Sequence, residues 1–211
     1  MVDGERVSEL QKVAILCTRR NSELLVFRHD RGGVQVPAGT VEFDEEVATA
    51  AIRELHEEAG ILVQAVTALF SLDEQGEADE RVVAADLPLH VAPDSSSPIS
   101  IPSLWRTWVR VREITGDFAQ VAIETWDDLG RVPATRSVSA EGFVPASALR
   151  THQLRHVFHA VAPADVLERW EIFAENQYIF RCYWAPLDDH GLIEGHSRWV
   201  KRARPLFPRG N

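Results

Sequence analysis

The sequence is poor in cysteine. It has two, Cys17 and Cys182, and each lies inside an apolar, strand-like run. A chain of 211 residues with so few cysteines does not have the composition of a disulfide-rich secreted scaffold. We therefore expect both thiols to be buried and reduced, as is usual for proteins of the cytoplasm.

Long apolar runs and an excess of basic residues are also lacking. No run approaches the roughly 20 apolar residues that cross a bilayer, and residues 1–10 are polar and charged, unlike a secretory leader. Lys and Arg number 22 against 32 Asp and Glu, for a net charge of −10. This charge disfavours polymeric nucleic acid and anionic membranes as partners. We expect a cytoplasmic protein, and a nucleotide ligand stays open because a bound cation reverses the local charge.

One stretch, residues 39–61, organises the chain. From Asp44 to Ala59 it has no Gly or Pro and is rich in Ala, Leu, Glu and Arg, which predicts a helix. Asp44 is the expected N-cap, and Gly60 is the expected residue that ends the helix. An apolar stripe at helical spacing should face a core. The members of this stripe are Ala48, Ala51, Ile52, Leu55 and Ala59.

Three glutamates, Glu54, Glu57 and Glu58, follow a different arc of this helix at i, i+3 and i+4. Like charges at that spacing cost about 0.2–0.5 kcal/mol per pair, so stability alone does not favour them. Only Arg53 offers a compensating charge nearby in the sequence. Three carboxylates on one rigid element suit a hard divalent cation such as Mg²⁺. The alternative is a solvated acidic helix face.

The stretch resembles the Nudix box, which reads Gly, five residues, Glu, seven residues, and then Arg-Glu-aliphatic-any-Glu-Glu-any-Gly-aliphatic. Every fixed position is filled and both spacings are right. The matching residues are Gly39, Glu45, Arg53, Glu54, Leu55, Glu57, Glu58, Gly60 and Ile61. A match of this length favours the resemblance over a solvated face. It implies an α/β (α+β) fold, the Nudix-type α/β/α sandwich with a mixed β-sheet.

The resemblance also implies a function. Nudix proteins are typically hydrolases that split a phosphoanhydride in a nucleoside diphosphate linked to another moiety. The chain is therefore expected to be a divalent-metal-dependent pyrophosphohydrolase whose partner is a small nucleotide derivative, with a nucleoside triphosphate and an ADP-ribose-like compound both open. The alternative is a Nudix-fold sensor or regulator that binds a nucleotide without turnover. Such proteins usually have eroded boxes, and this box is intact.

Site roles follow from the resemblance, residue by residue. The implied ligands of Mg²⁺ or Mn²⁺ are Glu54, Glu57, Glu58 and the carbonyl oxygen of Gly39. Arg53 and Glu45 are the implied pair that orients the glutamates, a task outside the metal's own ligand shell. The general base varies within the family, so Glu54 and Glu57 are both candidates.

Two further roles depend on more distant residues. Arg28 closes a predicted strand and is expected to hold a phosphate, because that strand end lies beside the active site in similar proteins; a solvated arginine is the alternative. Many family members use one more acid from a distant loop. Glu171 and Glu175 are the candidates, in an acidic segment that we predict to be a loop.

The rest of the chain is mainly strand-like. Strands are predicted at 12–18, 24–29, 62–72, 81–89, 104–112, 119–126, 154–162 and 178–184, loops at 88–103 and 127–142, and a final helix that ends near residue 204.

The order of these segments predicts one Nudix domain with a core of roughly 10–72 and 152–204 and an insertion at 73–151. The alternative is a domain at 1–150 with a C-terminal extension. The alternating strand at 104–112 carries two tryptophans, which suggests that the insertion supplies a dimer surface. A homodimer is therefore a candidate assembly.

Overall fold

The computed structural model describes residues 10–19, 22–29, 32–127, 135–174 and 178–207. The chain divides into two compact units. We call Gln11–Leu72 with Arg155–Asn211 the helix unit, and Met1–Leu10 with Asp73–Leu154 the strand unit. The strand unit covers nearly the residues predicted as an insertion, 73–151. The division does not say which unit was added to the other, so the insertion stays a prediction.

A mixed sheet forms the middle of the helix unit. Its main strands follow the order β14-β15-β2-β1-β13-β5, while β3 pairs with β2 and β4 with β1. The strands are β1 (Gln11–Arg19), β2 (Glu23–His29), β3 (Gly33–Gln35), β4 (Ala38–Thr40), β5 (Thr67–Gln75), β13 (His152–Val161), β14 (Arg169–Ala174) and β15 (Tyr178–Pro186).

Most neighbouring strands are antiparallel, and β1 with β13 is the parallel pair. The Leu154 N–H donates to the Leu10 carbonyl and the Ala162 N–H to the Thr18 carbonyl, each at 2.9 Å. Both pairs are separated by 144 positions (154 − 10 and 162 − 18), and a constant separation means that the strands run in the same direction. The predicted mixed sheet is confirmed.

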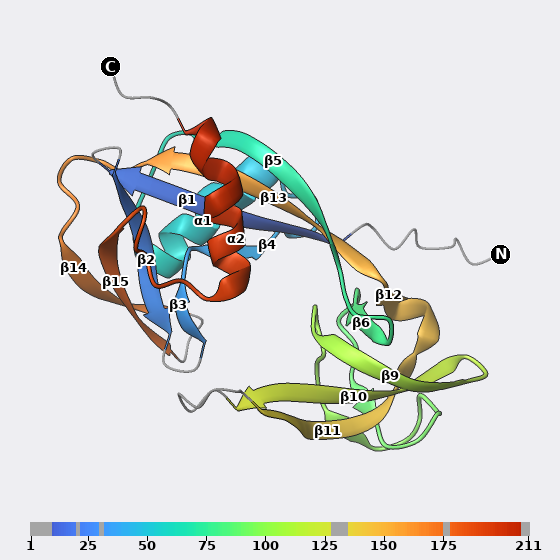
Figure 1. Ribbon diagram of the computed structural model, residues 1–211. Coiled ribbons are helices and arrows are strands. Elements are labelled where there is room, and N and C mark those ends of the chain that lie inside the picture. Colours follow the sequence, from blue (N-terminus) through green and yellow to red (C-terminus); the bar gives the residue numbers. More distant parts are fainter. Residues whose placement is uncertain (1–9, 20–21, 30–31, 128–134, 175–177, 208–211) are drawn as a thin grey trace. The chain divides into compact units, whose positions relative to one another are not determined.

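Two helices, α1 (Val47–Ala59) and α2 (Glu194–Ala203), cover opposite faces of this sheet (Figure 1). Along β1, the side chain of Ile15 joins the core beneath α1, and that of Leu16 joins the core beneath α2. Residues 13–17 are fully buried, as expected of a central strand packed on both faces. The predicted α/β/α sandwich is therefore confirmed.

The strand unit has its own antiparallel sheet, in the order β12-β6-β9-β10-β11-β7-β8. Its strands are β6 (Glu80–Val83), β7 (Leu89–His90), β8 (Ile99–Ile101), β9 (Trp108–Thr115), β10 (Phe118–Asp127), β11 (Thr135–Pro145) and β12 (Leu149–Arg150), with a 3₁₀ turn, η1, at Ala146–Ala148. A separate core fills it, built from Val83, Leu89, Leu104, Val109, Ala119, Val121 and Val144.

Several segment predictions were wrong. The loop expected at 127–142 contains most of β11, and the strand expected at 81–89 is split into β6 and β7. Gly142 lets β11 approach β7 closely, since a Cβ there would lie 2.5 Å from the His90 carbonyl oxygen. The acidic segment expected to be a loop is strand β14.

Helix α1 begins later than predicted. Asp44 has φ +61°, outside the helical region, and the first helical residue is Val47. The buried side includes Ala50 rather than Ala48. The predicted end is confirmed, because Gly60 has φ +68° and its N–H donates to the His56 carbonyl at 2.8 Å.

Both cysteines are buried in the core beneath α1 and are free thiols, as expected. Burial raises the pKa of Cys17 and of Cys182 to about 12, so both stay protonated at neutral pH. Among the helices that the structure describes, none is both long and apolar enough to cross a membrane.

The imidazole of His196 in α2 should make stability fall on acidification. Its Nδ1 accepts the Val36 N–H at 3.1 Å, and burial and Arg155 lower its pKa from 6.5 to about 3. Below pH 6.5, His196 therefore binds a proton in the unfolded chain, whereas in the folded chain its imidazole stays neutral down to about pH 3. This group alone should lower the free energy of unfolding by up to about 1.4 kcal/mol per pH unit as the pH falls. Urea unfolding between pH 5 and 8 measures this slope.

The matched variant is His196→Gln, which keeps an acceptor but does not titrate. We expect it to be less stable at pH 8 and to lose less stability on acidification to pH 5. Equal slopes in the two proteins would contradict the assignment.

Candidate active site

The box residues are placed by β4 and by the first three turns of α1. β4 pairs with β1, with Gly39 opposite Val13, which fixes the main chain of 38–40 beside the helix. Two of its main-chain N–H groups point to helix carboxylates. The Ala38 N–H donates to Glu58 Oε2 at 2.8 Å, and the Thr40 N–H donates to Glu54 Oε1 at 3.0 Å. The strand thus orients two of the three glutamates predicted as metal ligands.

Arg53 connects the rest of the site. Its Nε and Nη2 each donate to one oxygen of Glu45 at 2.9 Å, and its Nη1 donates to Glu54 at 2.9 Å and to Glu57 at 3.0 Å. Nη2 also donates to the Thr40 carbonyl oxygen at 2.8 Å. The hydrogen bonds that Arg53 donates to Glu45 are the main reason that the pKa of Arg53 lies above its ordinary value. One guanidinium therefore holds three carboxylates and the adjoining strand.

Glu45 lies before the helix rather than in its first turn. Its Oε2 also accepts the Glu42 N–H at 2.9 Å, and its own N–H donates to the Glu42 carbonyl at 3.2 Å. These bonds close a turn in which Asp44 takes its positive φ. The fixed spacing of Glu45 thus serves its pairing with Arg53 and not the helix dipole.

Glu54 is packed against Gly39. A Cβ built on Gly39 would lie 1.9 Å from the Glu54 carboxyl group, so any other residue would force this carboxyl group to move. The Glu54 side chain is 12% exposed, and its burial raises its pKa although Arg53 opposes the shift. The sequence suggested the Gly39 carbonyl as a metal ligand. The structure shows a further reason for glycine at this position.

Glu58 differs from the expectation of a solvated acidic face. The residue is 7% exposed, and its carboxylate lies under β4, where it accepts the Ala38 N–H. Glu57 is the solvated member, with a side chain that is 54% exposed. A solvated acidic face, the alternative considered for the three glutamates, therefore does not describe Glu58. The strand that covers it comes from outside the helix.

The three glutamates line one cavity of about 520 Å³. Its wall is completed by His56 of α1 and by Ile172, Phe173 and Ala174 of β14. These wall residues were not predicted. Three of them come from β14, more than 100 residues further along the chain. The backbone donors of Ala38 and Thr40 also leave no signal in a sequence.

The donor set of this cavity suits a divalent cation, since carboxylate oxygens are the ligands that Mg²⁺ and Mn²⁺ prefer. In the parts of the chain that the structure describes, however, no three His, Cys, Asp or Glu side chains converge closely enough to hold a metal ion. The carboxylates are instead turned toward protein donors, Glu54 and Glu57 toward Arg53 and Glu58 toward β4. Three carboxylates are a suitable type and number of ligands for a divalent cation. Their present hydrogen bonds, however, point them away from a common centre.

Arg28 and Glu171 are not brought to this cavity. Phe27 and Ile172, their neighbours in sequence, pack beneath α1, so Arg28 and Glu171 lie on the opposite face of the sheet. They line a second cavity, and Glu171 forms an ion pair with Arg181, with Nε 3.2 Å from Oε1. Glu175 lies outside the described residues.

Comparison with known proteins decides the family. A family model of the NUDIX domain matches residues 10–124, more than half of the 211-residue chain. The chain belongs to the Nudix family. Enzymes of the Nudix family generally act on nucleotide derivatives and use divalent metals such as Mg²⁺. The match includes the whole box of this Nudix protein, while β13–β15 and α2 lie beyond it.

Among solved structures, this Nudix protein is similar to the NUDIX domain of Shewanella oneidensis NrtR complexed with ADP ribose. The two are 10% identical over 94% of this chain and 88% of that chain, with a TM-score of 0.47. A likeness at this level says nothing about the ligand of this chain. No match was found among curated proteins.

The packing of Gly39 against Glu54 can be tested by a double-mutant cycle. Gly39→Ala should lower the free energy of unfolding by about 1–3 kcal/mol, because its Cβ takes the space of the carboxylate. In a Glu54→Ala background that space is empty, so the same change should cost less. Urea unfolding of the four proteins gives the coupling.

Gly195→Ala in α2 is the matched control, since a Cβ there meets open space. It should be neutral or stabilise by up to about 1 kcal/mol. A Gly39→Ala cost that is the same in both backgrounds would contradict the packing argument.

Proposed function

We propose that this protein hydrolyses a phosphoanhydride bond in a nucleoside diphosphate linked to another moiety, with Mg²⁺ or Mn²⁺ as its cofactor. The observation that carries the proposal is the Arg53 network. One guanidinium holds Glu45, Glu54 and Glu57 and the Thr40 carbonyl, at the edge of a cavity with three carboxylates. Such an arrangement is costly for a purely structural helix, since it places like charges side by side.

The three glutamates of α1 would hold the cation, with the Gly39 carbonyl as a further candidate ligand. When bound, a divalent cation offsets the charge of the phosphates and acidifies a water molecule for attack on phosphorus. The protein supplies the general base. Glu57 is the better candidate than Glu54, because its side chain is 54% exposed while that of Glu54 is 12% exposed and accepts the Thr40 N–H. Such a base needs to reach the water directly.

Arg53 and Glu45 are positioning residues in this proposal. Their paired hydrogen bonds fix the guanidinium, and the guanidinium in turn fixes the carboxylates of Glu54 and Glu57. The proposed contact of Arg28 with a phosphate involves a different face of the sheet and is considered below. Glu171 is not supported as an extra acid at the cavity lined by Glu54, Glu57 and Glu58 (the α1 cavity), because its carboxylate faces Arg181.

The test is a substrate panel with Mg²⁺ and with Mn²⁺. It contains nucleoside triphosphates and their oxidised forms, ADP-ribose, NADH, dinucleoside polyphosphates and nucleotide sugars. Release of phosphate, pyrophosphate or nucleoside monophosphate is measured for the wild type and for Glu57→Gln. We expect turnover of one class that requires the metal, and a loss of at least about a hundredfold in the variant, because a base contributes 10²–10⁴-fold.

The matched control is Glu194→Gln on α2, which removes an exposed carboxylate paired with Arg198 at i,i+4. It should keep full turnover, since surface pairs of this kind contribute little to stability. No hydrolysis of any panel member, together with tight nucleotide binding by calorimetry, would overturn the proposal in favour of a sensor. Unfolding of Glu57→Gln would instead make Glu57 structural.

A second variant separates positioning from charge. Arg53→Lys keeps a positive charge but cannot make the paired hydrogen bonds to Glu45. We expect turnover to fall about tenfold or more and the metal concentration for half-maximal rate to rise, because Glu54 and Glu57 lose their fixed orientation. The readout is turnover across a Mn²⁺ titration. An unchanged metal dependence would show that Arg53 does not position the ligands.

A further inference from the structure

A second cavity, of about 590 Å³, has most of its lining residues on the sheet face opposite α1, and Trp170 and Cys182 of the core beneath α1 complete its wall. It is lined by residues of β2, β14 and β15. Three arginines lie along it, Arg28, Arg169 and Arg181, which we call the arginine cluster. Tyr183 and Glu171 complete this side. The size is within the usual range for ligand pockets, roughly 300–1,000 Å³.

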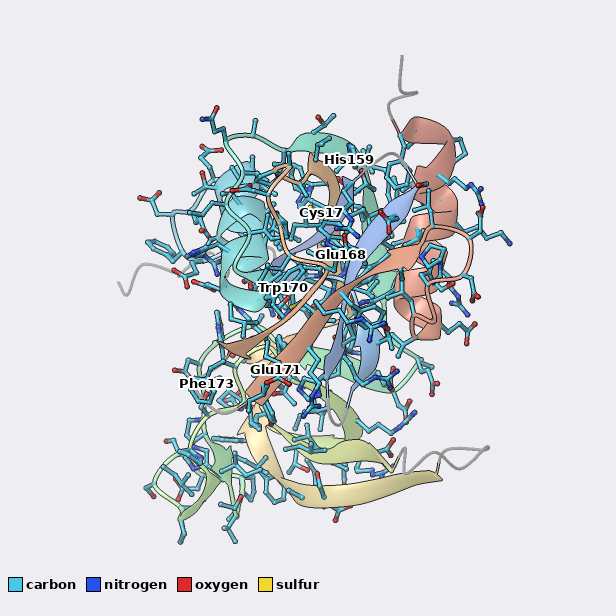
Figure 2. All side chains as sticks on the ribbon, turned by 90° about the vertical axis from the view of Figure 1, so that its left-hand side faces the viewer. Cys17, His159, Glu168, Trp170, Glu171 and Phe173 are labelled. Atoms are coloured by element: carbon cyan, nitrogen blue, oxygen red, sulfur yellow. The ribbon has the colours of Figure 1, made fainter. Side chains whose placement is uncertain are left out.

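The strand register places these side chains in one row. Arg181 lies directly opposite Arg28 on one side and Glu171 on the other. Arg169 lies opposite Tyr183, two positions along the same face. Figure 2 labels Trp170, Glu171 and Phe173 along β14. Because directly opposite residues share a face, the row presents two adjacent guanidinium groups and one carboxylate.

The row is electrostatically unfavourable by itself. Like charges directly opposite each other on neighbouring strands destabilise a sheet. Glu171 pairs with Arg181, whereas neither Arg28 nor Arg169 makes an ion pair with another residue in the described parts of the chain. The cluster therefore keeps a net positive charge in a protein whose overall charge is −10. A cavity with this charge attracts anions.

We propose that the arginine cluster binds a phosphate-bearing anion with two or more negative charges, and that Glu171 is the internal counter-ion that this ligand displaces. Guanidinium groups bind phosphate oxygens through paired, charge-assisted hydrogen bonds. The Glu171 side chain is 60% exposed and can leave Arg181 without being buried elsewhere. A diphosphate group offers enough oxygens for two arginines at once. The proposal does not depend on hydrolysis at the α1 cavity.

The probes are inorganic pyrophosphate and inorganic monophosphate, titrated by calorimetry at low salt with EDTA present. The wild type should bind pyrophosphate more tightly than monophosphate. Arg181→Gln and Arg28→Gln should each weaken pyrophosphate binding by about tenfold or more. Glu171→Gln should strengthen it by up to about fivefold, since it removes an exposed competing charge. The charge-matched control, Arg198→Gln on α2, should bind as the wild type does.

Circular dichroism and thermal unfolding show whether each variant is folded. A second variant, Arg181→Lys, keeps the charge and loses the paired hydrogen bonds. Pyrophosphate binding that is absent in the wild type, or unchanged in both Arg28→Gln and Arg181→Gln, would overturn the site. Weaker binding by Glu171→Gln would overturn the counter-ion role.

Measuring the KM with and without pyrophosphate shows whether the bound phosphate group belongs to the substrate or to a separate nucleotide. If the anion is part of the hydrolysed substrate, pyrophosphate should raise the KM for that substrate. If it belongs to a separate nucleotide, pyrophosphate should bind without changing the KM. Glu57→Gln should bind pyrophosphate like the wild type, so a failure of the proposed hydrolysis leaves this binding result intact.

Discussion

The guanidinium of Arg53 is the interaction on which the α1 cavity depends. It donates hydrogen bonds to Glu45, Glu54 and Glu57, and it also binds the main chain of Thr40. Without Arg53 these carboxylates would destabilise the fold, because neighbouring like charges repel and buried carboxylates lose solvation. The hydrogen bonds of Arg53 offset both costs. They also join helix to strand, so local charge balance and tertiary structure are set by the same side chain.

The sheet separates two cavities of opposite charge. Carboxylates line the cavity beneath α1, and arginines line the cavity on the other face. The short strand β14 borders both, because Ile172 contributes to the first and Glu171 to the second. A ligand with phosphates at a distance from its scissile bond could therefore be recognised from both sides of one edge strand.

The sequence was most informative where its signals are local. The helix and its end at Gly60 follow from local residue preferences, and the pairing of Arg53 with Glu45 was implied by the resemblance to the Nudix box. The sequence was least informative where a residue depends on a distant segment. Glu58 is buried by β4 rather than by its own helix, and Glu171 lies in a strand that its acidic neighbours made look like a loop. The position of Arg181 opposite Arg28 arises from pairing between strands over 150 residues apart, which no local pattern encodes.

The helix unit is built from two segments that are far apart in the chain, and this affects folding during protein synthesis. β1 and β2 leave the ribosome early, but their partners β13 and β15 come after the whole strand unit. Until then, side chains such as Ile15 and Phe27 lack the neighbours that bury them in the finished protein. The strand unit has both strands of every pair within residues 80–150, so its sheet can close before β13 and β15 are made. The nascent chain thus carries an open apolar half-sheet for much of its elongation, a state in which a chaperone would have the most to protect.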